Sequence, residues 1–340
     1  MIITRTPLRI SFFGGGTDYP VWSRENGGAV LSTAIDKYCY ITCRWMPPFF
    51  DYRSRVSYSK VENVAENTSI EHPSVRGCLQ FMNIREGIEI HHVADLPART
   101  GLGTSSAFTV GLLLSLYALQ DRMRDKHTLA QDAIYVEQEV LREAIGAQDQ
   151  VIAAYGGMNR INFHRDDSFD VQPLLAPRER IAELQDHMVL FFTGFARTAS
   201  EVAQVQIKET PNRRAELSTM YQMVSEAEAI LTDSKQSIGE FGRLLHESWK
   251  LKKSLTSKIS NPQIDEIYEA GLEAGAIGGK LLGAGGGGFM LFFVPPQQRK
   301  ALIVRLHNLL CVPITFPARG SHVVVYEPEK AYKEPKGVLV

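Results

Sequence analysis

The stretch LPARTGLGTSSAFTVGLLLSLYAL, residues 96–119, changes character halfway, and this change constrains the fold more than any other feature of the chain. It begins with proline and glycine, passes three hydroxyl residues and becomes an apolar run. This pattern predicts a buried helix that starts near Thr104. The hydroxyl-rich turn has two readings. Thr104 or Ser105 caps the helix, or Gly101 and Gly103 bring the backbone close to an anion at the helix N-terminus.

The order of the predicted elements indicates an α+β protein with two domains. β-rich runs dominate the first half of the chain, helical patterns dominate from about residue 196, and a β-rich segment returns near the C-terminus. A chain of 340 residues is long enough for two domains, which we predict at 1–190 and 191–340. Helices are expected from Thr104 and over 129–144, 148–155, 214–233, 237–256, 262–274 and 297–309, and strands over 2–13, 35–45, 87–93, 158–163, 187–194 and 321–327.

The overall composition argues against several classes of partner. Hydrophobic residues make up 44% and charged residues 22%, and the formal net charge of -1 gives no basis for binding nucleic acid or a membrane surface. The four cysteines form no CxxC pair, so neither a zinc site nor a disulfide framework is indicated. The N-terminus lacks the apolar core of a signal peptide, and the longest apolar run is too short to span a bilayer. We therefore expect a cytoplasmic protein.

Two stretches match well-known motifs only superficially. The glycines at 283–288 satisfy the dinucleotide-binding pattern, but they precede the strand-like FMLFFV, whereas that fingerprint opens a helix. The tripeptide at 164–166 resembles a protein-kinase catalytic loop, but Val171 stands where an asparagine is required. We interpret the first stretch as a loop before a strand and the second as a polar turn.

Glu137 stands out on the predicted helix 129–144, because a helical wheel places it in the middle of the apolar face. Glu139, two residues later, falls among polar residues on a solvated face. A buried carboxylate is costly unless it is paired or binds a cation. A pair with an arginine and a magnesium site both meet this requirement, and the helical pattern leaves the two open.

Asp149 lies in GAQDQVIAAYGG, where a short helix is expected over 148–155. The positive end of that helix stabilises its carboxylate. Asp149 is either an ordinary acid of the first turn or a functional group. Taken with the glycine clusters and Glu137, it points to phosphate and metal chemistry.

Three segments in order resemble the motifs of the GHMP small-molecule kinases: PLRISFFGGGTDYP, LPARTGLGTSSAFTV and GGKLLGAGGGGFMLFF. The resemblance runs nearly from end to end of the chain. It implies a ribosomal-S5-like N-terminal domain and a ferredoxin-like C-terminal domain, with the nucleotide bound between them.

The resemblance also implies roles for individual residues. Asp149 matches the catalytic aspartate, Arg9 lies beside the reacting hydroxyl, and Ser105 and Glu137 hold Mg²⁺. The phosphate loop that binds ATP comprises Arg99, Thr100, Gly101, Leu102, Gly103, Thr104, Ser105 and Ser106. The expected substrate-binding residues are Gly15, Gly16, Thr17, Asp18, Gly285 and Gly286.

The first motif bears on the substrate. Galactokinases carry RVNLIGEHTDY where this chain has RISFFGGGTDY, so Gly15 and Gly16 replace a Glu-His pair while Arg9 and Asp18 are kept. Two glycines open space and offer backbone N–H groups to an anion. The GGGTDYP version is typical of the branch that acts on D-glycero-D-manno-heptose 7-phosphate. The implied reaction is the transfer of a phosphoryl group from ATP to the anomeric hydroxyl of this sugar phosphate.

Three alternatives remain beside this reading. L-Fucose kinase domains share much of the pattern, some relatives of the fold bind sugar and ATP as sensors without turnover, and others are diphosphomevalonate decarboxylases. The retained acids and Arg9 disfavour a sensor, and the TDY motif disfavours a decarboxylase. The only expected partner is the small-molecule substrate, and a homodimer is left open.

Overall fold

The computed structural model describes residues 1–195 and 199–332, and it confirms the predicted α+β class. Two sheets organise the chain. The strands of the larger sheet are β1 (Ile2–Phe13), β2 (Gly28–Trp45), β3 (Ser54–Ser57), β4 (Val61–Val64), β5 (Ile88–Ala94), β6 (Met158–Phe163), β7 (Phe169–Pro173) and β12 (His322–Tyr326). Their order is β12-β1-β2-β5-β3-β4, and β6 and β7 extend the sheet from β2.

The long strand β2 is the centre of the larger sheet. It pairs antiparallel with β1 along most of its length, with β5 near its end and with β6 near its start. The second half of β1 is buried without interruption, because both the helix that follows residue 103 and a helix of the second layer contact it. This strand therefore carries Arg9 into the interior between the two layers.

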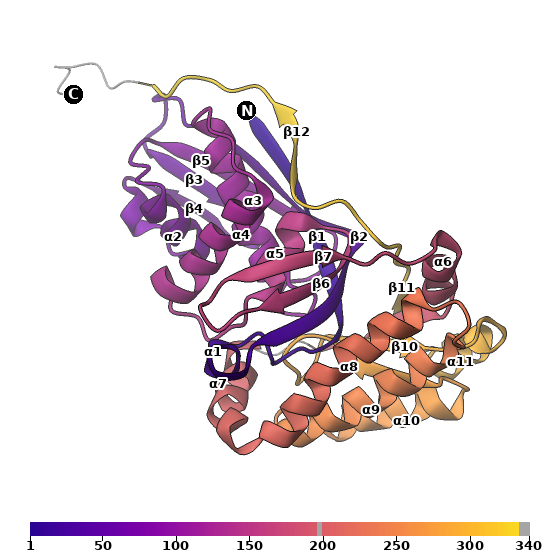
Figure 1. The fold of residues 1–340 in the computed structure, drawn as a ribbon. Helices are drawn as coiled ribbons and strands as arrows, with labels where there is room; N and C mark the ends of the chain where they lie inside the picture. Colours follow the sequence, from indigo (N-terminus) through magenta and orange to yellow (C-terminus); the bar gives the residue numbers. More distant parts are fainter. Residues whose placement is uncertain (196–198, 333–340) are drawn as a thin grey trace.

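The helices of the first half of the chain gather over the larger sheet, except the short helix Pro20–Asn26, which contacts the turn at Thr210–Asn212 (Figure 1). The helix α3 begins at Thr104 as predicted and is buried nearly throughout. Its N-cap is Gly103, at φ 72°, and no side chain caps it, so the reading of Thr104 or Ser105 as a cap is wrong. The helices are α1 (Pro20–Asn26), α2 (Pro73–Phe81), α3 (Thr104–Leu119), α4 (Lys126–Tyr135) and α5 (Gln148–Tyr155), with a 3-10 turn at Asn67–Ser69.

A second layer, at the lower right of Figure 1, combines a four-stranded sheet with helices. Its strands are β8 (Met188–Phe192), β9 (Gly278–Leu281), β10 (Phe289–Phe293) and β11 (Leu310–Val312), in the order β11-β8-β10-β9. Its helices are α6 (Arg178–Asp186), α7 (Ala199–Glu209), α8 (Arg214–Thr232), α9 (Gly239–Leu255), α10 (Pro262–Glu273) and α11 (Arg299–Arg305), with 3-10 turns at Thr210–Asn212 and Pro296–Gln298.

The strand pairing divides the chain differently from the predicted boundary between 1–190 and 191–340. That boundary falls inside β8, whose whole length belongs to the smaller sheet. Near the C-terminus, β12 returns to the larger sheet and pairs with β1, so that Ile2 lies opposite Tyr326 (Figure 1). A split by position alone misses such a return, because strand pairing joins segments that are far apart in sequence.

The predicted helix 129–144 is shorter than expected. The α-helix ends at Tyr135 and continues as a single π-helical turn, Val136–Val140, after which Arg142 has a φ of 55°. Such π turns occur frequently at functional sites. The helix 148–155 and the three helices at 214–232, 239–255 and 262–273 agree with the predictions within two residues at each end.

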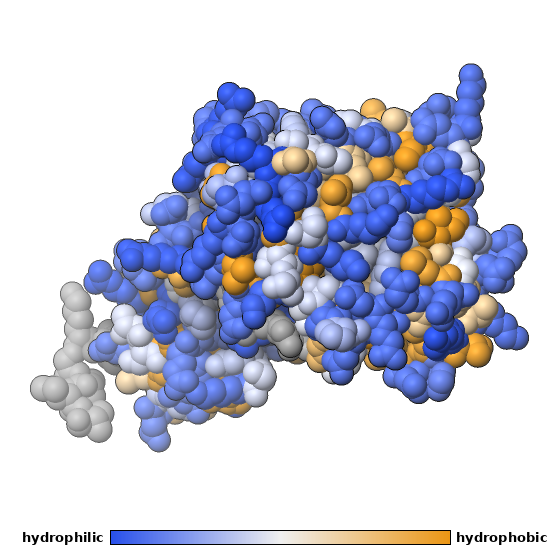
Figure 2. Space-filling model, turned by 90° about the horizontal axis from the view of Figure 1, so that it is seen from below, coloured by the Kyte–Doolittle hydropathy of each residue, from blue (hydrophilic) through white to orange (hydrophobic). Residues whose placement is uncertain are grey.

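Figure 2 shows hydrophilic side chains over most of the visible face, with hydrophobic ones in separate groups. Among the described helices, none combines the length and the apolar character that crossing a membrane requires.

Candidate active site

Three loops that are distant in sequence meet where the two layers join. They are 14–18 after β1, 99–103 before α3, and 283–288 between β9 and β10. The N–H of Phe289 donates to the carbonyl of Thr100 at 3.2 Å, which ties the third loop to the second. Each of the three resembled motifs therefore supplies one wall of the same site.

The second and third loops touch so closely that only glycine fits. Gly101 has a φ of +84°, and a Cβ added there would lie 2.3 Å from the carbonyl oxygen of Leu282. A Cβ on Gly283 would lie 2.4 Å from the Cα of Gly101. Glycine is needed at both positions because it adopts a positive φ freely and has no side chain to clash.

Arg9 and Asp149 form a bidentate ion pair at this junction. The Nε of Arg9 donates to Oδ1 of Asp149 and its Nη2 donates to Oδ2, both at 2.7 Å. The remaining Nη1 donates to the carbonyl of Gly101 at 2.5 Å. The Arg9 side chain is only 6% exposed and that of Asp149 is 25% exposed, so the carboxylate faces outward from a buried cation. The predicted catalytic pair is brought together, and it is fixed in orientation by two-point pairing.

Asp18, from the loop after β1, lies near this pair and contacts the first residue of α5. Its carboxylate accepts hydrogen bonds from the N–H of Gly16 at 2.9 Å, from the N–H of Gln148 at 3.3 Å and from Nε2 of Gln148 at 3.0 Å. Asp18 is 3% exposed. Burial raises the pKa of Asp18, and the negative charge of Asp149 raises it further, while the hydrogen bonds oppose the shift. A buried acid held by donors of this kind can in turn accept from a sugar hydroxyl.

Glu137 is buried, as the helical wheel predicted. It is 1% exposed, whereas Glu139 on the same turn is exposed. Its Oε2 accepts from the hydroxyl of Ser106 at 2.8 Å and from the side-chain amide of Gln150. Burial raises the pKa of Glu137 to about 7, against hydrogen bonds from Thr109 and Ser106. Within the described part of the chain, Glu137 forms no ion pair with an arginine and its Oε1 has no hydrogen-bond partner, which disfavours the arginine reading.

The structure does not bring Ser105 to Glu137. The Ser105 side chain is exposed at the start of α3, and the hydroxyl that reaches Glu137 belongs to the next residue, Ser106. A helix turns by about 100° per residue, so adjacent side chains point in different directions. The predicted shared role of Ser105 and Glu137 in holding a metal stays a prediction. The hydroxyl of Thr104 accepts from the N–H of Arg99 at 3.3 Å and thus closes the phosphate loop.

The first glycine loop leaves room at one of the predicted substrate residues. A Cβ on Gly15 would find only Nε2 of Gln148 and Oγ of Ser11, at 3.7 and 3.8 Å. In contrast, Gly16 has a φ of +106° and Thr17 is fully buried, with its hydroxyl donating to the carbonyl of Gly14 at 2.8 Å. Thr17 therefore holds the loop in place, and its contact with substrate stays a prediction.

Gly285 and Gly286 contact the loop that follows α9. A Cβ on Gly285 would lie 2.7 Å from the Cα of Ile259, and the N–H of Gly286 donates to the carbonyl of Ile259 at 2.9 Å. Close packing of two backbones explains these glycines. Their predicted contact with substrate is untested by this geometry.

Two lysines of the second layer, which the motif analysis did not single out, also reach the junction. Lys252 on α9 is 6% exposed and its ammonium group donates to the carbonyl of Gly283. Lys280 on β9 is 3% exposed and donates to the carbonyls of Ser11 and Phe12 at 2.9 and 2.8 Å. Burial lowers the pKa of both, and the positive charge of Arg9 lowers each further.

A signal for Lys252 was present in the sequence. It follows Leu245 and Trp249 on one face of α9 and precedes Leu255 on the same face, and all three neighbours are buried. A charged residue on the apolar face of a helix is the same pattern that singled out Glu137, here with a cation in place of the acid.

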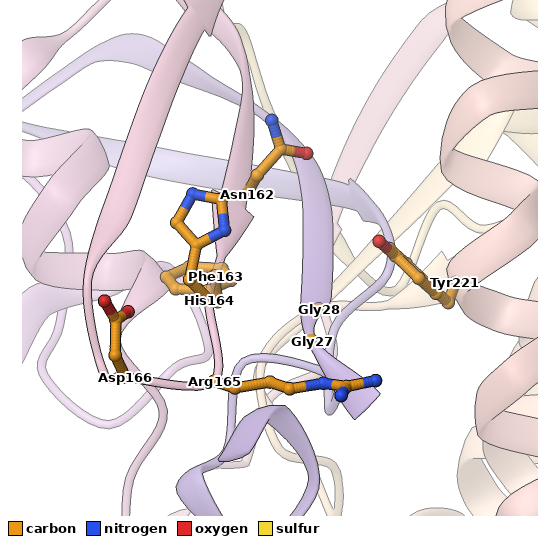
Figure 3. Close-up of a pocket in the computed structure, with 8 residues that line it drawn as sticks. All are labelled: Gly27, Gly28, Asn162, Phe163, His164, Arg165, Asp166 and Tyr221. Carbon is orange, nitrogen blue, oxygen red and sulfur yellow. The ribbon is translucent and has the colours of Figure 1, made fainter. Parts of the chain in front are cut away.

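A surface pocket of about 550 Å³ lies elsewhere, between the start of β2, the turn from β6 to β7 and α8 (Figure 3). His164, Arg165 and Asp166 form one side, and Tyr221 of α8 faces them (Figure 3). These three residues form the polar turn expected from the sequence. The pocket shares no residue with the junction that holds Arg9 and Asp149, so we assign the active site to the junction.

Two family models match the chain. The model described as "GHMP kinases N terminal domain" matches residues 67–157, and the one described as "GHMP kinases C terminal" matches residues 227–309. The chain therefore belongs to the GHMP kinase family and is a phosphotransferase. Kinases of this family use ATP.

Two relatives in sequence are sugar kinases. The chain is 30% identical to the D-glycero-alpha-D-manno-heptose 7-phosphate kinase of Campylobacter jejuni, over 84% of this chain and 86% of that one. It is 26% identical to the bifunctional fucokinase/GDP-fucose pyrophosphorylase of Arabidopsis thaliana, over 82% of this chain and 28% of that longer protein.

A solved structure has the same fold. The crystal structure of a D-glycero-D-manno-heptose 1-phosphate kinase from Bacteroides thetaiotaomicron superimposes with a TM-score of 0.76 at 25% identity, covering 98% of this chain and 100% of that one. The GHMP kinase fold expected from the three motifs is thus confirmed.

Proposed function

We propose that this kinase transfers the γ-phosphoryl group of ATP to the anomeric C1 hydroxyl of a sugar phosphate, D-glycero-D-manno-heptose 7-phosphate. The product would be the 1,7-bisphosphate, a precursor of nucleotide-activated heptose for surface polysaccharide. The observation that carries the proposal is the buried Arg9–Asp149 pair, whose arginine also binds the phosphate loop at Gly101. It joins the acceptor side of the site to the nucleotide side through one guanidinium group.

The chemistry requires little covalent participation by the protein. A bond forms between the acceptor oxygen and the γ-phosphorus, and the bond from that phosphorus to the bridging oxygen of ADP breaks. Asp149 orients the acceptor hydroxyl and accepts its proton as the new bond forms. Arg9 holds the Asp149 carboxylate in one orientation and brings positive charge to the reacting oxygens.

The nucleotide phosphates fit the loop 99–106 at the start of α3. Gly101 and Gly103 both have a positive φ there, and no side chain blocks the first N–H groups of the helix. Glu137 suits Mg²⁺, because its Oε1 is buried and unpartnered among the described residues and a cation would offset the cost of burying its charge. A bound Mg²⁺ would neutralise phosphate charge.

The acceptor side offers unused polar groups for sugar hydroxyls. Oγ of Ser11 and Oε1 of Gln148 are buried and have no hydrogen-bond partner among the described residues. Both side chains lie around the free space at Gly15, and Gln148 also binds Asp18. Buried polar groups without partners are costly, so a hydroxylated ligand at this place would satisfy them.

The named relatives support a phosphorylated heptose as the acceptor. Two of them carry heptose phosphate in their names, although one name gives the 7-phosphate and the other the 1-phosphate. The fucokinase relative favours a second candidate, a kinase for a free sugar such as L-fucose. A sugar sensor without turnover and a decarboxylase are the remaining outcomes of the test below.

A panel of acceptors tests the proposal. ADP formation is measured with D-glycero-D-manno-heptose 7-phosphate, L-fucose, mannose and galactose, and the product is identified by ³¹P NMR. We expect kcat/KM for the heptose phosphate to exceed that for each free sugar by a factor of about 10² or more, because remote binding energy positions the reacting hydroxyl. An equal or better free sugar would replace the proposal with a fucose-type kinase. No turnover would indicate a sensor, and release of CO₂ a decarboxylase.

Gly15→Glu sharpens this test. A glutamate at the open position near Ser11 and Gln148 adds bulk and negative charge where we expect the phosphorylated sugar. It should lower kcat/KM for the sugar phosphate more than for a free sugar, while ATP affinity stays near that of the wild type. Equal losses for both acceptors would remove the acceptor phosphate from this part of the site.

A further inference from the structure

Among the described residues, the junction of the two layers buries three basic side chains but has only two carboxylates. Arg9, Lys252 and Lys280 are each at most 6% exposed, and the nearby acids are Asp18 and Asp149. Each carboxylate oxygen of Asp149 accepts a hydrogen bond from Arg9. Within residues 1–195 and 199–332, neither lysine forms an ion pair with a carboxylate, and both donate to backbone carbonyls. A buried cation without a counter-ion is costly, so such a cluster is suited to an anionic ligand.

Lys252 reaches the nucleotide loop from the second layer through one intermediate residue, Gly283. Its ammonium group donates to the carbonyl of Gly283, and Gly283 packs directly on Gly101 of the phosphate loop. Arg9 donates to the carbonyl of Gly101 from the other layer. Gly101 and Gly283 are in contact, and each accepts a hydrogen bond from one of the two cations: Gly101 from Arg9 of β1, and Gly283 from Lys252 of α9.

The charges that act on Lys252 come from the catalytic pair and its surroundings. Burial and the positive charge of Arg9 lower the pKa of Lys252, Asp18 and Asp149 raise it, and the balance is a pKa of about 8. Lys280 on the neighbouring strand feels the charge of Lys252 in turn. At neutral pH Lys252 thus keeps its proton and presents a cation beside the carboxylate that we expect to receive the acceptor hydroxyl.

We propose that Lys252 is a catalytic residue that binds the transferred phosphoryl group from the second layer, opposite Arg9. This inference rests on the proposed phosphoryl transfer. In the reaction, the phosphoryl oxygens carry negative charge while the bond to the acceptor oxygen forms and the bond to ADP breaks, and the ammonium group of Lys252 balances part of it. Lysine serves as a point charge for phosphate in this role. Lys280 holds the end of β1 through Ser11 and Phe12 and positions Arg9.

The next residue on α9 provides a matched control. Lys253 forms an ion pair with Asp265 at 3.0 Å, with 29% of its side chain exposed. Lys252→Met and Lys253→Met therefore remove the same charge from adjacent positions of one helix. Lys252→Arg keeps the charge and tests rescue by a conservative change. Thermal melting of each variant at pH 7 verifies that it folds.

Nucleotide binding tests the inference without any sugar, so its outcome is independent of the acceptor. Isothermal titration calorimetry in Mg²⁺ compares ADP with a non-hydrolysable ATP analogue, which differ by the γ-phosphoryl group. We expect Lys252→Met to bind ADP within a factor of about two of wild type and the ATP analogue about 10-fold or more weakly, since a charged hydrogen bond is lost. Lys252→Arg should restore part of the loss, and Lys253→Met should match wild type.

Turnover measurements then show whether Lys252 binds the γ-phosphoryl group of ATP or the phosphate of the acceptor. With any acceptor that the wild type phosphorylates, Lys252→Met should lower kcat by a factor of about 10² or more. Unchanged affinity for the ATP analogue, with a loss confined to a phosphorylated acceptor, would place Lys252 on the acceptor's own phosphate and overturn the inference. Parallel losses of ADP affinity, ATP-analogue affinity and melting temperature would mean a structural role and overturn it equally.

Discussion

The two layers of the molecule contribute to the site in different ways. The layer of the larger sheet supplies Arg9, Asp149 and Glu137, each from a segment with a recognisable motif or a clear break in an apolar face. The second layer supplies Lys252 from α9 and Lys280 from β9, neither of which the motif analysis singled out. Acids and an arginine thus come from one layer, and two buried lysines from the other.

This difference shows what local sequence can convey. Phosphate loops need glycine at particular backbone angles, and that requirement is written in a few adjacent residues. A lysine is common on protein surfaces, so its burial depends on how a whole helix packs. Sequence motifs therefore reveal the site residues of the first layer and miss those of the second.

The largest expected effect tests the first layer. Asp149→Ala should lower kcat by about 10² to 10⁴, because the group that orients and deprotonates the acceptor is lost. Affinity for ATP, measured by calorimetry, should change little. A variant that keeps a third of the wild-type kcat would remove Asp149 from the mechanism and leave the Arg9 pairing as a structural feature.

The next effect concerns the contact between the layers. Gly101→Ala places a Cβ 2.3 Å from the carbonyl of Leu282 at a φ of +84°, so either the phosphate loop or the third glycine loop must move. We expect ATP affinity to fall by a factor of about 10 to 100, equivalent to about 1.4–3 kcal/mol. Gly15→Ala is the control, since its Cβ has room and should leave ATP affinity unchanged. Equal ATP affinity in Gly101→Ala and wild type would separate the nucleotide site from this contact.

A smaller effect distinguishes the two glutamates of the π-helical turn. Glu137→Gln should raise the Mg²⁺ concentration for half-maximal rate by about 10-fold, because the amide keeps the shape of the side chain and loses the charge that binds a cation. The exposed Glu139→Gln should leave the magnesium titration unchanged. Identical titrations for the two variants would rule out Glu137 as the metal ligand.

For Glu137, the sequence predicted the burial of the side chain but not its hydrogen-bond partners. Its burial followed from helical periodicity, and the π turn did not alter it, because Val136 and Glu137 are both buried where the α-helix ends. Its partners could not be predicted. Ser106 and Gln150 come from α3 and α5, and their approach to Glu137 depends on the packing of three helices. The neighbouring Ser105, singled out by the motif, remains exposed.

The fold shows the same limit. Helix positions after residue 214 were predictable from apolar spacing and from Asn261, which caps α10 through its side chain. The short strands β3, β4 and β7 were missed, since four or five residues carry little periodicity. The return of β12 to β1 is a long-range pairing that no local pattern predicts.

The last prediction concerns the second layer and is measured as protein stability, with no change in activity or binding involved. Burial lowers the pKa of Lys252 from 10.5 to about 8, so at pH 7 the folded protein carries the cost of a buried charge that the unfolded chain does not. Between pH 8 and 10.5 the unfolded chain binds more protons than the folded one, and the contribution of this lysine to stability rises with pH.

Lys252→Met removes the titration. The free energy of unfolding of the variant relative to wild type should therefore fall by up to about 3 kcal/mol from pH 7 to pH 10. Denaturant unfolding at several pH values measures this change, and Lys253→Met should show none of it. A difference between Lys252→Met and wild type that stays constant with pH would mean that Lys252 is not buried as a cation. The two layers would then differ only in whether sequence motifs mark their residues.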